Sequence, residues 1–240
     1  YMTRAEMSFK RILVSAPPML QILNQIKDDS DQLGLELVGA KVTQTLSEKE
    51  LIEIIPSYDG WIIGDDPATK NVFEAGKKGL LKAAVKWGIG VDNVDFQACK
   101  SFDIPITNTP GMFGKEVADM ALGYIISLSR NIVEIDRNVR AGDWSKPQGI
   151  SLAGKTVALL GYGDIGRNTA KRLNALEMKV IAYDPQINEA CLEEGSELSI
   201  WPQRIEEADF LVITCSLNKS TFHLINSDVF SIMKRGIMLV

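Results

Sequence analysis

The chain has 240 residues, a length that suits two domains of about 100–130 residues each. Hydrophobic residues make up 45% of it and charged residues 24%, a composition that excludes a disordered or fibrous protein. The 26 basic and 31 acidic residues give a net charge of −5 with no block of Lys and Arg, so nucleic-acid binding is not expected.

Short aliphatic runs alternate with helical patterns along the whole chain, which is typical of a parallel α/β fold. In the first half the apolar runs predict strands at 12–16, 35–40, 61–64, 81–87 and 104–107. Helices are predicted at 19–27 and 47–55, and Ser47 and Glu50 have the spacing of a capping box at the start of the second. The strands are nearly continuous apolar runs, as expected when helices cover both faces of a sheet.

The longest helical pattern runs from 115 to 140, with apolar residues three and four apart, and Gly142 then gives a stop signal. A second alternating series follows. Its predicted strands are 156–160, 180–183, 210–214 and 237–240, and its predicted helices are 165–176, 201–206 and 227–233. Prolines and glycines interrupt regular structure at 105–111, so we expect a domain boundary there, between 1–109 and 110–240.

The sequence has no sign of a membrane span or of a targeting segment. Its longest uncharged apolar stretch, 120–129, has about half the residues needed to cross a bilayer, and no charged-then-apolar signal opens the chain. The three cysteines, Cys99, Cys191 and Cys215, lie far apart with no CxxC pair. We therefore expect a cytoplasmic protein with neither a disulfide framework nor a metal site.

A glycine-rich segment at 161–166 follows a predicted strand and precedes a predicted amphipathic helix. Gly161 permits a tight turn, Gly163 lets the backbone approach a pyrophosphate, and Gly166 allows the helix to pack closely on the strand. The start of the helix then offers unpaired N–H groups and a partial positive charge to the phosphates. The motif predicts a dinucleotide site, with a tight turn that binds no ligand as the alternative.

Asp184 supports the dinucleotide interpretation, because it lies 18 residues after Gly166 at the end of the predicted strand 180–183. A carboxylate at this point can accept hydrogen bonds from the 2′- and 3′-hydroxyls of an adenosine ribose. It would also repel the 2′-phosphate of NADP, and no Arg follows it in 185–187. The sequence therefore predicts NAD as the cofactor, with a solvated aspartate as the alternative.

Several further blocks occur along the chain in a characteristic order. They are KWGIGVDNVD (86–95), NTPG (108–111), VAD (117–119), SRNI (129–132), AGDW (141–144), LAGKT (152–156), YDP (183–185) and ADF (208–210). With them the chain resembles the D-isomer-specific 2-hydroxyacid dehydrogenases from about residue 12 to its end, and it is most similar to the D-3-phosphoglycerate dehydrogenase-like branch. The resemblance implies two doubly wound parallel-sheet domains with a cleft between them. A flavodoxin-like substrate domain comes first and a Rossmann NAD-binding domain, incomplete at its C-terminus, follows.

The resemblance also implies a substrate site in the block 86–95. The backbone amides of Ile89 and Gly90 would bind the substrate carboxylate, and a glycine-rich turn at the end of a strand can aim N–H groups at an anion. The alternative is that Gly88 and Gly90 simply end the strand. Lys86 and the neighbouring Trp would border the pocket or belong to ordinary packing.

The cofactor contacts that the resemblance implies come from the glycine-rich loop and from three other places. They are Val117, Gly161, Tyr162, Gly163, Asp164, Ile165, Gly166, Asp184 and Cys215. Asp164 and Ile165 would lie against the pyrophosphate, Val117 would face the nicotinamide side, and the Cys215 loop would lie beside the adenosine. The family usually has Arg where Asp164 stands, and an acid there weakens pyrophosphate binding unless it points away. Cys215 replaces a Thr or Pro, and its thiol is expected to act as a small apolar group.

The chemistry of the family needs an Arg that binds the substrate carboxylate and carbonyl, a Glu, and a His that acts as general acid and base. In the family's order these residues follow the strand 237–240, so no catalytic residue is expected before Val240. We interpret the 240 residues as the larger part of a longer enzyme. The single histidine, His223, precedes that point and is expected to be structural or to face solvent.

The function implied is an NAD-dependent oxidoreductase that interconverts a small D-2-hydroxy acid and its 2-keto acid, with a 3-phosphoglycerate-like substrate among the candidates. A first alternative is an NAD-sensing interaction protein without catalysis on the same scaffold. A second is a Rossmann-type S-adenosylmethionine methyltransferase, which leaves the blocks 88–95 and 108–111 unexplained.

The family further implies a homodimer built largely on the helix 115–140 and the arm after it. The helix has apolar residues outside its main apolar stripe, namely Val117, Met120, Tyr124, Ile126 and Val133. Such a surplus favours burial against a second subunit as well as against the chain's own domain. No nucleic acid or membrane partner is expected.

Overall fold

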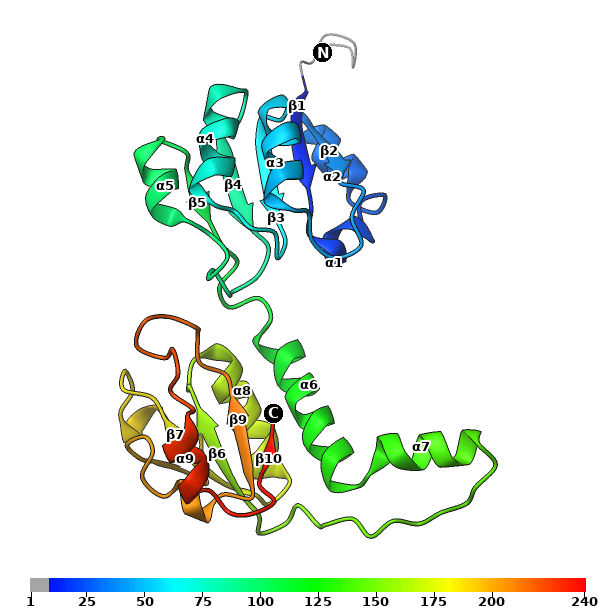
Figure 1. Ribbon diagram of the computed structural model, residues 1–240, viewed down its shortest axis with the longest axis vertical. Helices are drawn as coiled ribbons and strands as arrows, with labels where there is room; N and C mark the ends of the chain where they lie inside the picture. The colour runs from blue at the N-terminus through cyan, green and yellow to red at the C-terminus, as the bar shows by residue number, and fades with distance from the viewer. Residues whose placement is uncertain (1–8) are drawn as a thin grey trace. The chain divides into compact units, whose positions relative to one another are not determined.

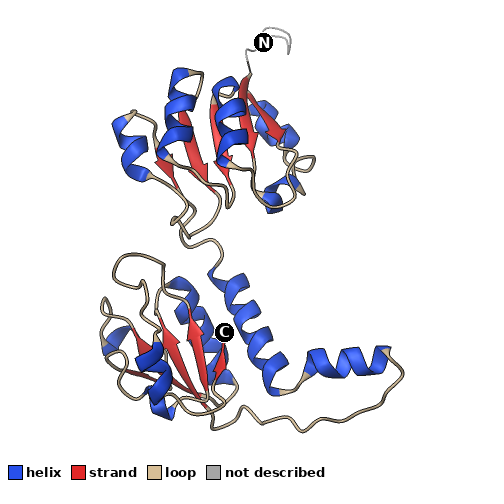
Figure 2. Cartoon of the chain, viewed as in Figure 1, coloured by secondary structure: helices blue, strands red, loops and turns tan. Residues whose placement is uncertain are grey.

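The computed structural model describes residues 9–240 (Figure 1). The chain divides into two compact units, Tyr1–Met112 and Phe113–Val240. The boundary between them lies three residues after the predicted one. Each unit has a five-stranded sheet and hydrophobic clusters of its own. Helices flank the strands in each unit, as Figure 2 shows.

The first unit, residues up to Met112, is built on one parallel sheet. Its strands are β1 (Lys10–Val14), β2 (Leu35–Gly39), β3 (Gly60–Ile63), β4 (Ala83–Lys86) and β5 (Ile106–Thr107). They pair in the order β2-β1-β3-β4-β5, and every pair is parallel. This is the order of the flavodoxin-like doubly wound fold, so the predicted fold class of this unit is confirmed.

The helices of the first unit are α1 (Pro17–Leu20), α2 (Lys27–Gln32), α3 (Glu48–Ile54), α4 (Lys70–Lys78) and α5 (Phe96–Ser101), with the 3-10 turn η1 (Ile55–Ser57). The predicted capping box at α3 is confirmed, because the Ser47 and Glu50 side chains each accept the other residue's backbone N–H. The predicted helix 19–27 was wrong. Residues 21–26 form successive turns instead. The apolar side chains of these turns pack against the cluster around Val14, and their spacing along the sequence resembles that of an amphipathic helix.

The second unit is also built on one parallel sheet. Its strands are β6 (Thr156–Leu160), β7 (Lys179–Tyr183), β8 (Ser196–Leu198), β9 (Phe210–Ile213) and β10 (Met238–Leu239). They pair in the order β10-β9-β6-β7-β8. Counted within the unit, this is the 3-2-1-4-5 order of a Rossmann sheet, so the predicted fold class is confirmed here too. The short edge strand β8 was not predicted.

The helices of the second unit are α6 (Gly114–Ser129), α7 (Ile132–Arg140), α8 (Asp164–Ala175) and α9 (Ser227–Ile232), with the 3-10 turns η2 (Glu189–Cys191) and η3 (Ile205–Glu207). The prediction of one helix over 115–140 was wrong, because Asn131 has a left-handed conformation (φ 55°) that separates α6 from α7. Asn adopts this conformation more readily than most side chains, so the chain turns without a glycine. The predicted helix 201–206 is reduced to η3.

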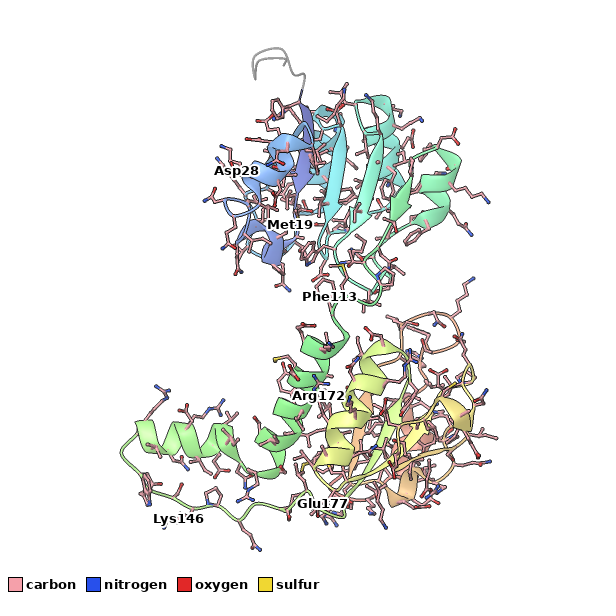
Figure 3. The ribbon with its side chains drawn as sticks, turned by 180° about the vertical axis from the view of Figure 1, so that it is seen from behind. Met19, Asp28, Phe113, Lys146, Arg172 and Glu177 are labelled. Carbon is pink, nitrogen blue, oxygen red and sulfur yellow. The ribbon has the colours of Figure 1, made fainter. Side chains whose placement is uncertain are left out.

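Helix α6 packs along α8, and an ion pair ties the two together. Arg172 is labelled on α8 in Figure 3. Its Nε lies 2.6 Å from Asp119 Oδ1 on α6. None of the helices within residues 9–240 is long and apolar enough to cross a membrane.

Asp209 fixes the start of the central strand β6. Its Oδ2 accepts the Thr156 N–H at 2.9 Å, and its Oδ1 lies 3.1 Å from the Lys234 ammonium. Burial by itself would raise the pKa of this carboxyl, but the Thr156 N–H and Lys234 outweigh burial and hold the pKa below its usual 3.8. The ionised carboxylate therefore stabilises the folded state.

We expect Asp209→Ala to lower the free energy of unfolding by about 1–3 kcal/mol, because the Thr156 N–H loses its acceptor. Since the pKa is lower in the folded state, the carboxylate's contribution is present above pH 3.8 and is lost as the pH falls further. Urea denaturation of both proteins measures the difference, with Glu206→Ala, which removes an exposed acid nearby, as the control. Equal midpoints for the unmutated protein and Asp209→Ala would contradict the prediction.

Candidate functional site

The glycine-rich loop of the second unit joins β6 to α8, and two of its glycines are required by packing. Gly161 has a φ of +97°, and a Cβ there would lie 2.5 Å from the backbone nitrogen of Cys215. A Cβ on Gly166 would lie 2.2 Å from the carbonyl oxygen of Gly161. No side chain fits at either position, so helix α8 can approach β6 this closely only with glycine at both.

Gly163 differs from the other two glycines, because nothing lies within 4 Å of the place where its Cβ would be. It is the N-cap of α8 and is exposed to solvent. Ile165 lies in the first turn of this 12-residue helix, where backbone N–H groups have no partner within the helix. The open space at Gly163 therefore faces a helix start that favours an anion.

Asp184 follows β7 directly and holds the glycine-rich loop. Its carboxylate accepts the Tyr162 N–H at 2.8 Å and the Gln186 N–H at 2.9 Å. Each oxygen keeps a second lone pair, so the oriented carboxylate can still accept hydrogen bonds from ribose hydroxyls. The Tyr162 side chain is buried, and its hydroxyl accepts the Glu193 N–H, so this residue serves the loop through its backbone.

Asp164, the departure from the family pattern, is packed against the start of α6. Its Oδ2 lies 2.2 Å from the place of a Cβ on Gly114, so the carboxylate occupies space that a side chain at Gly114 would fill. The other oxygen accepts the Asn168 Nδ2–H at 3.1 Å. Oδ2 is buried with no hydrogen-bond partner within the described part of the chain. The acid is thus directed at Gly114.

The two remaining residues of the predicted cofactor site come from α6 and from the segment after β9. Val117 is exposed on the first turns of α6, which packs against α8. Cys215 follows β9 and is half-buried, and burial, with a smaller effect of the Asp184 charge, raises the pKa of its thiol. The thiol is therefore neutral at ordinary pH and acts as a small apolar group. Sequence reasoning missed Thr214, whose hydroxyl donates to the Gly161 carbonyl at 2.8 Å.

The predicted substrate loop of the first unit follows β4 and is held by the block 108–111. Gly88 has a φ of +135°, and its N–H donates to Thr109 Oγ1 at 2.9 Å. The Ile89 carbonyl accepts the Asn108 side-chain N–H at 3.2 Å. Within residues 9–240, the N–H groups of Ile89 and Gly90 donate to no protein acceptor. Two adjacent free donors at the carboxyl end of a strand suit a carboxylate.

Hydrogen bonds join the substrate loop to the segment 64–66, which follows β3. Lys86 is buried, and its ammonium donates to the Gly64 carbonyl at 2.6 Å and to Asp65 Oδ1 at 3.0 Å. Asn93, which sequence reasoning did not single out, donates to the carbonyls of Gly64 and Asp66 at 3.1 and 2.7 Å. Its place in the block 86–95 was the only signal for it. Lys86 therefore supports the loop from the protein's interior.

His223 lies far along the chain from both loops. It is exposed, and its ring stacks on Phe222 with the centroids 4.0 Å apart. No group of three or more His, Cys, Asp or Glu side chains in the described residues could hold a metal ion. Besides the ring contact with Phe222, the His223 carbonyl accepts the Asn226 side-chain N–H at 3.3 Å.

A Rossmann sheet, a glycine-rich loop with an open helix start and an acid at the end of the second strand define the second unit as a dinucleotide-binding domain. Comparison with known proteins agrees. Residues 122–240 match the NAD binding domain of the D-isomer specific 2-hydroxyacid dehydrogenases. The cofactor of this domain is accordingly NAD, and the loop and Asp184 fit it.

Relatives match the first unit as well. The chain is 35% identical over 226 residues to hydroxypyruvate reductase of Thermotoga maritima, covering 92% of this chain and 72% of that protein. It is 31% identical over 234 residues to D-3-phosphoglycerate dehydrogenase of Archaeoglobus fulgidus, covering 96% of this chain but 43% of that protein. The structure of apo D-lactate dehydrogenase from Escherichia coli matches with a TM-score of 0.81 at 27% identity, over 95% of this chain and 72% of that one. The chain belongs to the D-isomer-specific 2-hydroxyacid dehydrogenase family.

Cofactor choice is expected to depend on Asp184. The unmutated chain should bind NADH clearly more tightly than NADPH. Asp184→Ala should reduce the difference between the two affinities, mainly by weakening the binding of NADH. Each hydrogen bond lost from the carboxylate is worth about 1.5–3 kcal/mol. Because Ala also removes the acceptor of the Tyr162 N–H, Asp184→Asn, which keeps an oxygen there, serves as the matched variant. Fluorescence titrations that give equal affinities for both nucleotides in the unmutated chain would contradict the assignment.

Proposed function

We propose that this chain carries the NAD-binding and substrate-binding parts of an oxidoreductase that interconverts a D-2-hydroxy acid and its 2-keto acid. The observation that carries the proposal is the pair of unpartnered N–H groups of Ile89 and Gly90, in a chain that also has an NAD-binding domain. Its relatives include enzymes named for reducing hydroxypyruvate and glyoxylate and for dehydrogenating D-3-phosphoglycerate. All of these compounds have a carboxylate beside the reacting carbon.

Each part of the site has a distinct task in this proposal. The two amides hold the substrate carboxylate, which orients the neighbouring carbon, and the NAD domain binds the cofactor, which accepts or donates the hydride. A 2-keto acid also needs a group that polarises its carbonyl and an acid near neutral pH. The family resemblance puts the Arg, Glu and His for these tasks after the strand 237–240, so we infer that they lie outside the 240 residues.

The proposal predicts that the 240-residue chain binds NADH but has negligible turnover with glyoxylate, hydroxypyruvate or phosphohydroxypyruvate. General acid–base catalysis contributes about 10²–10⁴-fold, and the loss of carbonyl polarisation costs a comparable factor. An NADH-oxidation assay on the purified chain tests this. Turnover at ordinary enzyme rates that His223→Ala abolishes would show that the wrong histidine had been assigned.

Binding experiments separate this function from the alternative of an NAD sensor. Millimolar hydroxypyruvate or D-glycerate should bind the NADH-saturated chain, and Gly90→Pro, which removes one of the two N–H donors, should abolish that binding. NADH binding must survive in the Gly90→Pro variant, because this residue belongs to the other unit. If NADH binds and neither acid does, the sensor is the better interpretation.

We also propose a homodimer that forms over α6 and α7. Seven apolar side chains on these helices are between 40% and 54% exposed: Val117, Met120, Tyr124, Leu128, Ile132, Val133 and Val139. Helix α7 has no buried residue at all, although it is strongly amphipathic. An apolar surface of this kind on a single chain favours burial against a partner, and a two-fold dimer is the commonest arrangement.

Light scattering at micromolar concentration should give twice the mass of one chain. The double variant Met120→Glu with Val133→Glu should give the mass of a single chain, because each substitution puts a charge on the apolar surface. Leu33→Glu, at an exposed leucine of the other unit, is the control and should leave the dimer intact. A single-chain mass for the unmutated protein would count decisively against the dimer.

A further inference from the structure

The carboxyl end of the first unit's sheet has an excess of negative charge. The segments that leave β1 to β5 there are 15–16, 40–47, 64–69, 87–95 and 108–112. Together they contain four aspartates, at 65, 66, 92 and 95, against one lysine, Lys41, in the segment after β2. Lys86, the last residue of β4, supplies the one positive charge at the start of the substrate loop.

The Lys86 ammonium is already compensated by a carboxylate. It is 3.0 Å from Asp65 Oδ1 and donates to the Gly64 carbonyl. The N–H of the same Gly64 residue donates to Asp66, which is completely buried and also accepts the Leu46 N–H at 2.8 Å. No cation among residues 9–240 forms an ion pair with Asp66. The Lys86 ammonium is thus paired with Asp65, and the charge of Asp66 is balanced by no ion pair in the described chain, so little positive charge is left to attract a ligand.

A further carboxylate lies beside the proposed substrate amides. Asp92 is exposed, and its Oδ1 lies 3.6 Å from the place of a Cβ on Gly90. Within the described residues no lysine or arginine forms an ion pair with it. A ligand held by the Ile89 and Gly90 amides therefore meets a negative charge at the edge of the site.

We propose that this site takes a small 2-keto or 2-hydroxy acid whose carboxylate is its only anionic group, and that it disfavours a phosphorylated substrate. The inference rests on the proposed function, because it concerns the same two amides. The two N–H groups hold one carboxylate and carry no net charge that could balance a second anionic group. A phosphate adds a charge of about −1.5 to −2, for which Lys86, paired with Asp65, has no free capacity and which Asp92 repels.

The test compares D-glycerate with 3-phospho-D-glycerate, which share a carbon skeleton and differ by the phosphate. Both are titrated calorimetrically into the NADH-saturated chain, so that no hydride transfer consumes the ligand. D-glycerate should bind at least about tenfold more tightly. The double variant Asp65→Asn with Asp92→Asn should narrow this ratio by strengthening the binding of the phosphorylated ligand. Both side chains are exposed, and Asp65→Asn keeps a side-chain oxygen that can accept the hydrogen bond of the buried Lys86 ammonium while removing its counter-charge.

Glu53→Gln is the matched control, because it removes one charge from an exposed position on α3 of the same unit and should leave the ratio unchanged. Equal or tighter binding of 3-phospho-D-glycerate by the unmutated chain would overturn the inference, and would indicate that exposed lysines such as Lys41 and Lys70 reach the phosphate. An unchanged ratio in the double variant would also overturn it. Failure of both ligands to bind would instead contradict the proposed function itself.

Discussion

The parallel direction of all the strands in each sheet is the constraint on which both sites depend. Because the strands of one unit run the same way, the segments that leave their carboxyl ends meet at one edge. In the second unit this brings the loop 161–166, Asp184 and Thr214 together, although up to 53 residues separate the hydrogen-bonded partners. In the first unit it brings 64–66 against 86–93. The topology of each sheet therefore brings together the residues of its site, which no single motif contains.

The three glycines of the motif are needed for two different reasons. Gly161 and Gly166 are required by the fold, since a Cβ on either would collide with backbone atoms. Gly163 is not required by any packing of the chain itself, because the space around it is open. A glycine with open space around it at an exposed helix N-cap leaves room for a ligand to approach the backbone.

Most of the secondary structure and the motifs could be predicted from sequence, because they depend on residues close together in the chain. Interactions between residues far apart in the chain could not be predicted in this way. Continuous apolar runs, the spacing of the glycines and the Ser47 capping box depend on neighbours in the chain, and the structure has them as expected. The break at Asn131 was missed because apolar spacing continues through it, so periodicity could not reveal a single left-handed residue. The task of Lys86 was also hidden, because its acceptor is a carbonyl 22 residues away.

Asp164 shows how such a distant contact settles a question that the motif leaves open. An acid in the glycine-rich loop opposes pyrophosphate binding only if its charge faces the phosphates. Here the carboxylate packs against Gly114, and the absence of a Cβ at that residue makes room for it. Because Gly114 starts α6 and Asp164 starts α8, the contact also joins the two helix ends that border the loop. The departure from the family pattern is thus accommodated by a second residue, because a side chain at Gly114 would collide with the Asp164 carboxylate.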